Sequence, residues 1–164
     1  MGNKEPIRIS DDRMRHIRGV AEQAYRIAFA ANLGEEFARK MYVLGFLHDV
    51  GYALNGNPSS HPKVGASVLG DSGYAFSAAV GLHGNPDAEQ SVALAILNVS
   101  DMTVDGYGRL VTMSERLTDI ASRHGDDSRV TQECVRLVDM LRSVVPGMVA
   151  LAEAIVLGHR EDGE

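Results

Sequence analysis

Hydrophobic residues recur at every third or fourth position through most of the chain, a spacing that predicts amphipathic helices. The clearest stripe covers residues 17–31 and ends at the turn-forming residues 32–34. A second helix is predicted over residues 35–48, and we expect Gly51 and the run 55–58 to break the chain after it. The first part of the sequence therefore predicts two helices joined by a short turn.

Six further helical segments are predicted from the same spacing. We expect them to begin at Ser59 or Ser60, to cover 73–82, to run from a cap at Asp87 through Val99, and to cover 114–123, 128–144 and 146–157. Thr112 and Glu115 have the spacing of a capping box. The one candidate strand, residues 110–113, is too short to found a sheet. The pattern therefore predicts an all-α bundle of about seven to eight helices.

Composition agrees with close-packed helices. Of the 164 residues, 45% are hydrophobic and 5% are aromatic, with no tryptophan. The core must therefore be built from Ala, Val, Leu, Ile and Met, which suits helices better than packed sheets. Cys134 is the single cysteine, and we expect it to be a small buried hydrophobe rather than a nucleophile. We expect residues 1–10 to form a flexible lead-in.

A formal net charge of −6 argues against general binding of a nucleic acid duplex, because a phosphate backbone needs a basic face. It does not exclude a small phosphorylated ligand, since a bound metal cation can supply local positive charge. No stretch approaches the roughly 18 apolar residues of a membrane span, and residues 1–10 lack the apolar core of a secretion signal. We therefore expect a cytoplasmic protein with no membrane partner.

Metal-ligating residue types occur in or beside the predicted helices. In chain order they are His16, His48 with Asp49, His61, His83 and Asp101. Imidazole and carboxylate together are the ligand set for Zn, Mn, Fe, Co or Ni, and ligands from several helices can converge in a bundle core. His48 and Asp49 are neighbours at a helix end, where the backbone can bend so that both reach one ion. The partial negative charge of that helix end also favours a cation.

This order resembles the HD superfamily, which is named after its adjacent histidine and aspartate. The family pattern has a histidine in the first helix, the doublet at the end of a following helix and an aspartate in a later helix. His16, the doublet within Leu44–Gly51, and Asp101 match that pattern, and the resemblance covers roughly residues 13–125. It implies a single HD domain over residues 11–160. It also implies a metal-dependent phosphohydrolase that acts on a nucleotide or other small phosphate ester through a metal-activated water.

A second metal ion is implied by the same resemblance. The segment from His61 to Ala66 is similar to a His-x-x-x-Gly-Ala element of HD hydrolases that bind two ions, and His83 lies where those members place a further histidine. His61 and His83 would then hold a second ion, with Asp49 bridging the pair. Alternatively, both histidines contact substrate beside one ion, or they are a helix-start and a helix-end residue with no ligand role.

The group that neutralises the substrate phosphate is open. Some relatives carry a lysine shortly after the doublet, but residues 51–53 here are Gly-Tyr-Ala. Lys63, Arg15 and Arg18 are the substitutes that the sequence offers, and we predict Asp49 and Lys63 as the catalytic residues. Asp105 and Arg109 flank a glycine-rich loop that forms either a lid over the site or a plain surface loop.

Two other functions fit the same residues. A metal-holding HD fold can sense a nucleotide without hydrolysing it, and the missing lysine keeps that alternative open. A weaker alternative is an oxygenase with a di-iron site, which some HD relatives are. The divalent metal is Mn, Fe, Co, Ni or Zn, with one ion expected and a second dependent on His61 and His83. The helical C-terminal third offers a surface for a homodimer.

Overall fold

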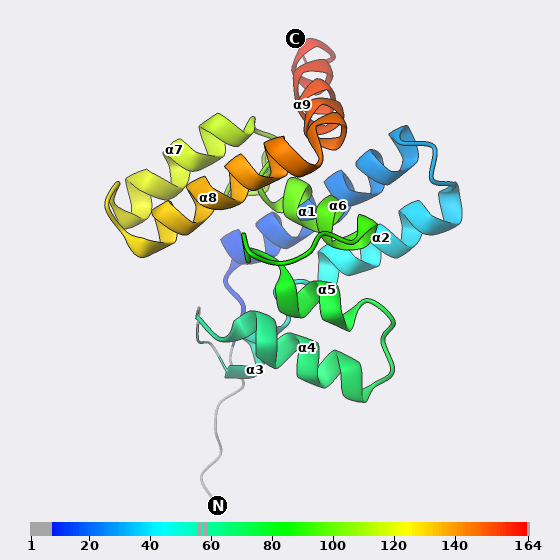
Figure 1. Ribbon diagram of the computed structural model, residues 1–164, viewed down its shortest axis with the longest axis vertical. Coiled ribbons are helices and arrows are strands. Elements are labelled where there is room, and N and C mark those ends of the chain that lie inside the picture. The colour runs from blue at the N-terminus through cyan, green and yellow to red at the C-terminus, as the bar shows by residue number, and fades with distance from the viewer. Residues whose placement is uncertain (1–7, 56, 58, 164) are drawn as a thin grey trace, which may run out of the picture.

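The computed structural model describes residues 8–55, 57 and 59–163, and these form nine α-helices without a named strand (Figure 1). The helices are α1 (Asp11–Ala30), α2 (Glu35–Leu47), α3 (Gly51–Asn55), α4 (His61–Asp71), α5 (Ser77–Leu82), α6 (Val92–Asp101), α7 (Met113–His124), α8 (Arg129–Val144) and α9 (Pro146–Glu161). A single isolated bridge joins Val104 to Leu110 among the described residues. The predicted all-α fold is confirmed.

Polar side chains cap α1, α6, α7 and α8 at their N-termini, where backbone N–H groups lack helical partners. Ser10 and Ser128 accept from the amides three residues ahead in α1 and α8. Thr112 and Glu115 form the predicted capping box of α7. The predicted cap at Asp87 is wrong, because Ser91 caps α6. Asp87 instead pairs with Arg136 of α8 at 2.6 Å, so its carboxylate joins the loop before α6 to α8.

Several elements differ in extent from the prediction, beginning with the segment after α2. We expected a break from Gly51 onward, but residues 51–55 form the short helix α3. A Cβ on Gly51 would overlap the carbonyl oxygen of His61, so only glycine lets α3 approach the start of α4 this closely. The expected helix over residues 73–82 is also shorter, since α5 starts at Ser77. The last helix is longer than predicted, since α9 reaches Glu161 and not residue 157.

The core lies between the antiparallel pair α1 and α2 and the central helix α6 (Figure 1). A Cβ on Gly45 would lie 2.7 Å from Cα of Ala21, so the two helices of the pair nearly touch there. All eight residues of α6 from Ala93 to Ser100 are buried. Helices α7, α8 and α9 cover one side of this core and α3 to α5 the other. The C-terminal ends of α2 and α6 are thereby brought to the N-terminal half of α1.

No described helix is on its own both long enough and apolar enough to cross a membrane, although α8 and α9, bent by 109° at their junction, meet the length and composition limits as a pair. The expected lead-in falls largely on residues 1–7, which lie outside the described part of the chain. Residues 8–10 are not helical, and Ser10 ends them as the cap of α1.

Candidate metal centre

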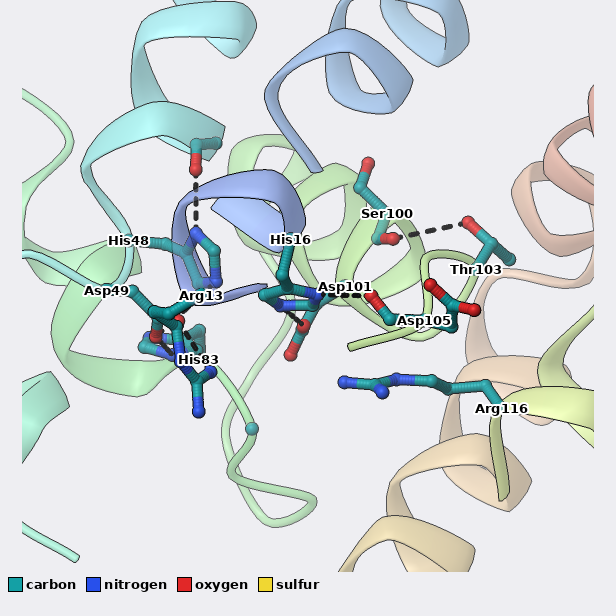
Figure 2. Close-up of polar contacts among 12 residues, drawn as sticks. Arg13, His16, His48, Asp49, His83, Ser100, Asp101, Thr103, Asp105 and Arg116 are labelled. Atoms are coloured by element: carbon teal, nitrogen blue, oxygen red, sulfur yellow. Dashed lines mark hydrogen bonds and ion pairs between the residues drawn. The ribbon is translucent and has the colours of Figure 1, made fainter. Parts of the chain in front are cut away.

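Five elements contribute the predicted ligands. His16 lies in α1, the doublet follows α2, His61 begins α4, His83 follows α5 and Asp101 ends α6. The His16, His48 and Asp49 side chains are 1–3% exposed, His83 is 5% exposed, His61 13% and Asp101 20%. Figure 2 shows His16, His48, Asp49, His83 and Asp101 as neighbours at the bundle core. Titratable side chains buried in this way need partners or an ion.

The structure groups five of these residues, all but Asp101, into two sets that share one carboxylate. His16, His48 and Asp49 form the first set, and Asp49, His61 and His83 form the second. Within each set all donor atoms lie within 4.8 Å of one another. Donors that bind one ion at the usual bond lengths lie about 3–4 Å apart. Asp49 is thus the one residue whose carboxylate both sets would use.

Donor distances within the cluster fit that spacing. Oδ1 of Asp49 lies 3.1 Å from Nε2 of His61, 3.5 Å from Nε2 of His48 and 3.8 Å from Nε2 of His83. The Nε2 atoms of His61 and His83 are 3.3 Å apart. Asp101 joins on the other side, with Oδ1 at 3.0 Å from Nε2 of His16. Five of the six predicted ligands are therefore brought together in the two sets, and Asp101 adjoins them through its contact with His16. Their binding of metal stays a prediction.

Backbone carbonyls fix the tautomer of three of the histidines. Nδ1 of His48 donates to the carbonyl of Gly45 and Nδ1 of His83 to that of Val80, both at 2.6 Å. Nδ1 of His16 donates to the carbonyl of Asp105 at 2.9 Å. In a neutral imidazole this leaves the lone pair on Nε2, which is the arrangement found around protein-bound metals. Each of these Nε2 atoms faces the cluster.

The electrostatics of the cluster keep Asp49 and His83 in the forms that bind metal. Burial opposes ionisation of Asp49, but His48, the hydrogen bond from His61 and Arg13 hold its pKa well below the ordinary value. Burial lowers the pKa of His83 to about 4, so this imidazole is neutral near pH 7. Metal ligands must be deprotonated carboxylates and neutral imidazoles. Converging lone pairs repel one another unless a cation lies between them, so the donor set fits a divalent transition ion.

Arg13 is the cation nearest to the shared carboxylate, and the sequence analysis did not single it out. Its Nη1 donates to Oδ2 of Asp49 at 2.9 Å. The guanidinium lies 4.4 Å from the centre of the Tyr52 ring, which in turn stacks on His61 with ring centres 4.1 Å apart. Arg13 precedes His16 by three residues and thus shares its helix face, a signal that could have identified it.

The loop after α6 is anchored and is not a free lid. Oδ1 of Asp105 accepts from the amides of Tyr107 and Arg109, each at 2.9 Å, and Oδ2 accepts from Nε of Arg109 at 2.7 Å. Gly108 has φ +84°, and a Cβ there would overlap the carbonyl of Arg15 in α1. Asp105 is 2% exposed. The loop therefore packs against α1, and the backbone carbonyl of Asp105 faces His16.

Other residues that the sequence suggested lie away from these contacts. The Lys63 side chain is exposed in the first turn of α4, and no polar contact joins it to a ligand within the described part of the chain; its catalytic role stays a prediction. Arg15 is exposed and pairs with Asp12, and Arg18 is exposed. Half-buried Cys134 packs on the core, and burial raises its pKa to about 11, which agrees with a non-nucleophilic thiol.

This protein is therefore an all-α bundle with histidines and carboxylates buried at one centre, a donor set suited to metal. The family model of the HD domain matches residues 13–141, so this chain belongs to the HD domain family. That match confirms the predicted family and extends through most of α8. No curated protein and no solved structure matches the chain.

Proposed function

We propose that this protein is a metal-dependent phosphohydrolase that acts on a nucleotide or another small phosphate ester. The observation that carries the proposal is the pair of overlapping donor sets that share Asp49. His16, His48, Asp49 and Asp101 would hold one ion, and Asp49, His61 and His83 a second. A bound ion of this kind supplies Lewis acidity and lowers the pKa of water to about 7.

The charges around the centre suit an anionic substrate. Asp49 pairs with Arg13, and Asp101 lies near Arg116, a buried arginine of α7. Against the effect of burial, the hydrogen bond with His16 and the nearby His48 and Arg116 hold the pKa of Asp101 below its usual range. Ligand histidines are neutral. Bound metal ions would therefore add positive charge to a centre whose carboxylates already lie beside arginines, and that charge would favour an anionic substrate.

Arg13 is placed to contact the substrate phosphate. Its side chain is 36% exposed, whereas the Asp49 side chain that it contacts is 3% exposed, so the guanidinium stands between the buried cluster and solvent. Its stacking on Tyr52 restricts its orientation. Arginine offers paired donors that match phosphate oxygens. On these grounds Arg13, rather than Lys63, is the cation that we assign to the phosphate.

The enzymatic proposal is tested by assaying purified protein with Mn²⁺, Co²⁺, Fe²⁺ or Zn²⁺ against nucleotides and phosphate esters. We expect release of phosphate or of a nucleotide product that disappears with chelator and in Asp49→Ala. His124→Ala is the control, because His124 is an exposed histidine at the end of α7. If metal-loaded protein binds nucleotides but releases no product from any of them, the hydrolase proposal is wrong and a sensor is favoured.

The assignment of the phosphate cation is tested with Arg13→Ala, Lys63→Ala and Arg15→Ala. A hydrogen bond to a charged group contributes about 1.5–3 kcal/mol, so Arg13→Ala should lower kcat/KM about 10- to 100-fold. Arg15→Ala removes a guanidinium from the exposed face of the same helix and should stay within about twofold. A larger loss in Lys63→Ala than in Arg13→Ala would reverse the assignment.

A further inference from the structure

Arg116 is a buried cation near the centre to which the proposed function gives no contact with substrate. It lies in α7 and is 7% exposed, so its guanidinium is almost wholly removed from solvent. Figure 2 shows this group pointing toward Asp101, at the other end of the row of ligand side chains from Arg13. A buried guanidinium is costly unless its donors and its charge are matched.

The pairing of Arg116 within the described chain is incomplete. Nη1 donates to Oδ2 of Asp119 at 2.7 Å, but the same oxygen also accepts from Nη2 of Arg123 at 2.6 Å. One carboxylate therefore faces two guanidinium groups. Nε of Arg116 is buried and has no hydrogen-bond partner among the described residues. Asp101 is the other nearby anion, and it is also 3.0 Å from His16 as a predicted metal ligand.

We propose that Arg116 forms a second anion-binding point of this centre, so that the site prefers a substrate with two linked phosphate groups over one with a single phosphate. This inference rests on the proposed function. When Asp101 is engaged by metal, the charge of Arg116 is left without a full counter-ion. Arg13 beside Asp49 then takes one phosphate group, and Arg116 beside Asp101 takes the next. Nucleoside diphosphates and other phosphoanhydrides are the matching chemical class.

The experiment measures binding of orthophosphate and pyrophosphate to Mn²⁺-loaded protein by calorimetry, with metal content checked afterwards to exclude stripping by pyrophosphate. We expect the wild type to bind pyrophosphate at least tenfold more tightly than orthophosphate. Arg116→Gln should remove most of that preference while orthophosphate affinity changes little. Arg39→Gln is the matched control, since Arg39 is an exposed arginine of α2 that pairs with Glu35 and touches neither Asp119 nor a predicted ligand, and it should keep the preference.

Arg116→Lys keeps the charge but loses the planar donor array, so it should retain part of the preference and serves if the glutamine variant does not fold. A wild type without preference for pyrophosphate, or a loss in Arg116→Gln that is equal for both anions, overturns the inference. Hydrolysis assays separate the two proposals. An Arg116-dependent preference without turnover leaves this inference standing and refutes the hydrolase, whereas turnover without the preference does the opposite.

Discussion

The loop that carries Asp105 holds His16 of the first helix in place. Removing the Asp105 carboxylate should therefore weaken metal binding measurably. In Asp105→Ala, the amides of Tyr107 and Arg109 lose their acceptor. The carbonyl that receives Nδ1–H of His16 then sits on a loop that keeps its backbone hydrogen bonds but has lost those to the Asp105 side chain. The ligand set itself is left complete. The variant thus perturbs the orientation of His16 without deleting any predicted metal donor.

The size of the effect follows from the bonds lost. Two hydrogen bonds at 2.9 Å to backbone amides disappear, each worth about 1 kcal/mol, so the free energy of unfolding should fall by about 2 kcal/mol. The exposed Arg109 side chain adds little, because surface ion pairs contribute little. Loss of a group that orients a ligand histidine typically weakens metal affinity about 10- to 100-fold. We expect that range for the ion held by His16.

The assay is a competitive Co²⁺ titration followed by the visible absorption of the bound ion, together with urea denaturation of the metal-free protein. Asp105→Ala should show weaker Co²⁺ binding and a changed spectrum. Asp105→Asn keeps an acceptor for the amides and should retain most of the affinity, and Arg109→Ala should behave like wild type. Unchanged Co²⁺ affinity in a folded Asp105→Ala protein would refute the idea that this loop positions His16.

Three further outcomes follow from the same geometry. Gly51→Ala should displace the start of α4 and with it His61, so elemental analysis should show loss of the second metal equivalent. Gly147→Ala is the control, because its Cβ meets nothing within 4 Å, and it should bind metal as wild type does. As the pH falls from 6.5 to about 4, the metal-free protein should lose up to about 3 kcal/mol of stability, because buried His83 stays neutral while the unfolded state takes up the proton. His83→Gln should flatten that part of a profile of melting temperature against pH. Chelation should lower the melting temperature of wild type more than that of His48→Ala, and equal shifts would speak against a site at the doublet.

Periodicity and capping patterns were sufficient to predict the long helices because those signals are local. The capping box at Thr112 and the stops after the first two helices are read from neighbours in the sequence. The short helix α3 was missed because its formation depends on Gly51 meeting the backbone of His61, a contact between segments. Asp87 was assigned as a cap for the same reason: its partner Arg136 lies 49 residues away, and the sequence does not show that pairing.

The sequence predicted the role of a side chain only where that residue type is unusual at its position in a helix. Adjacent histidine and aspartate at a helix end stand out, and the structure brings them together with the other predicted ligands. Arginines on helices do not stand out, since most lie in solvent as Arg15 and Arg18 do. The two that face the centre, Arg13 and Arg116, are distinguished by burial and by partners on other helices. Those properties belong to packing; the sequence shows only that Arg13 lies three residues before His16 on the same helix.

The positions of the histidines explain why the centre needs a loop as well as helices. His48 and His83 each follow the last turn of a helix, where carbonyls lack helical partners, and each donates Nδ1–H to the carbonyl three residues earlier. One bond thus satisfies a helix end and fixes a ligand tautomer. His16 lies inside α1, where the backbone carbonyls are already used, so its Nδ1 needs an acceptor from elsewhere. The Asp105 carbonyl is that acceptor, which is why we expect a substitution outside the ligand set to weaken metal binding.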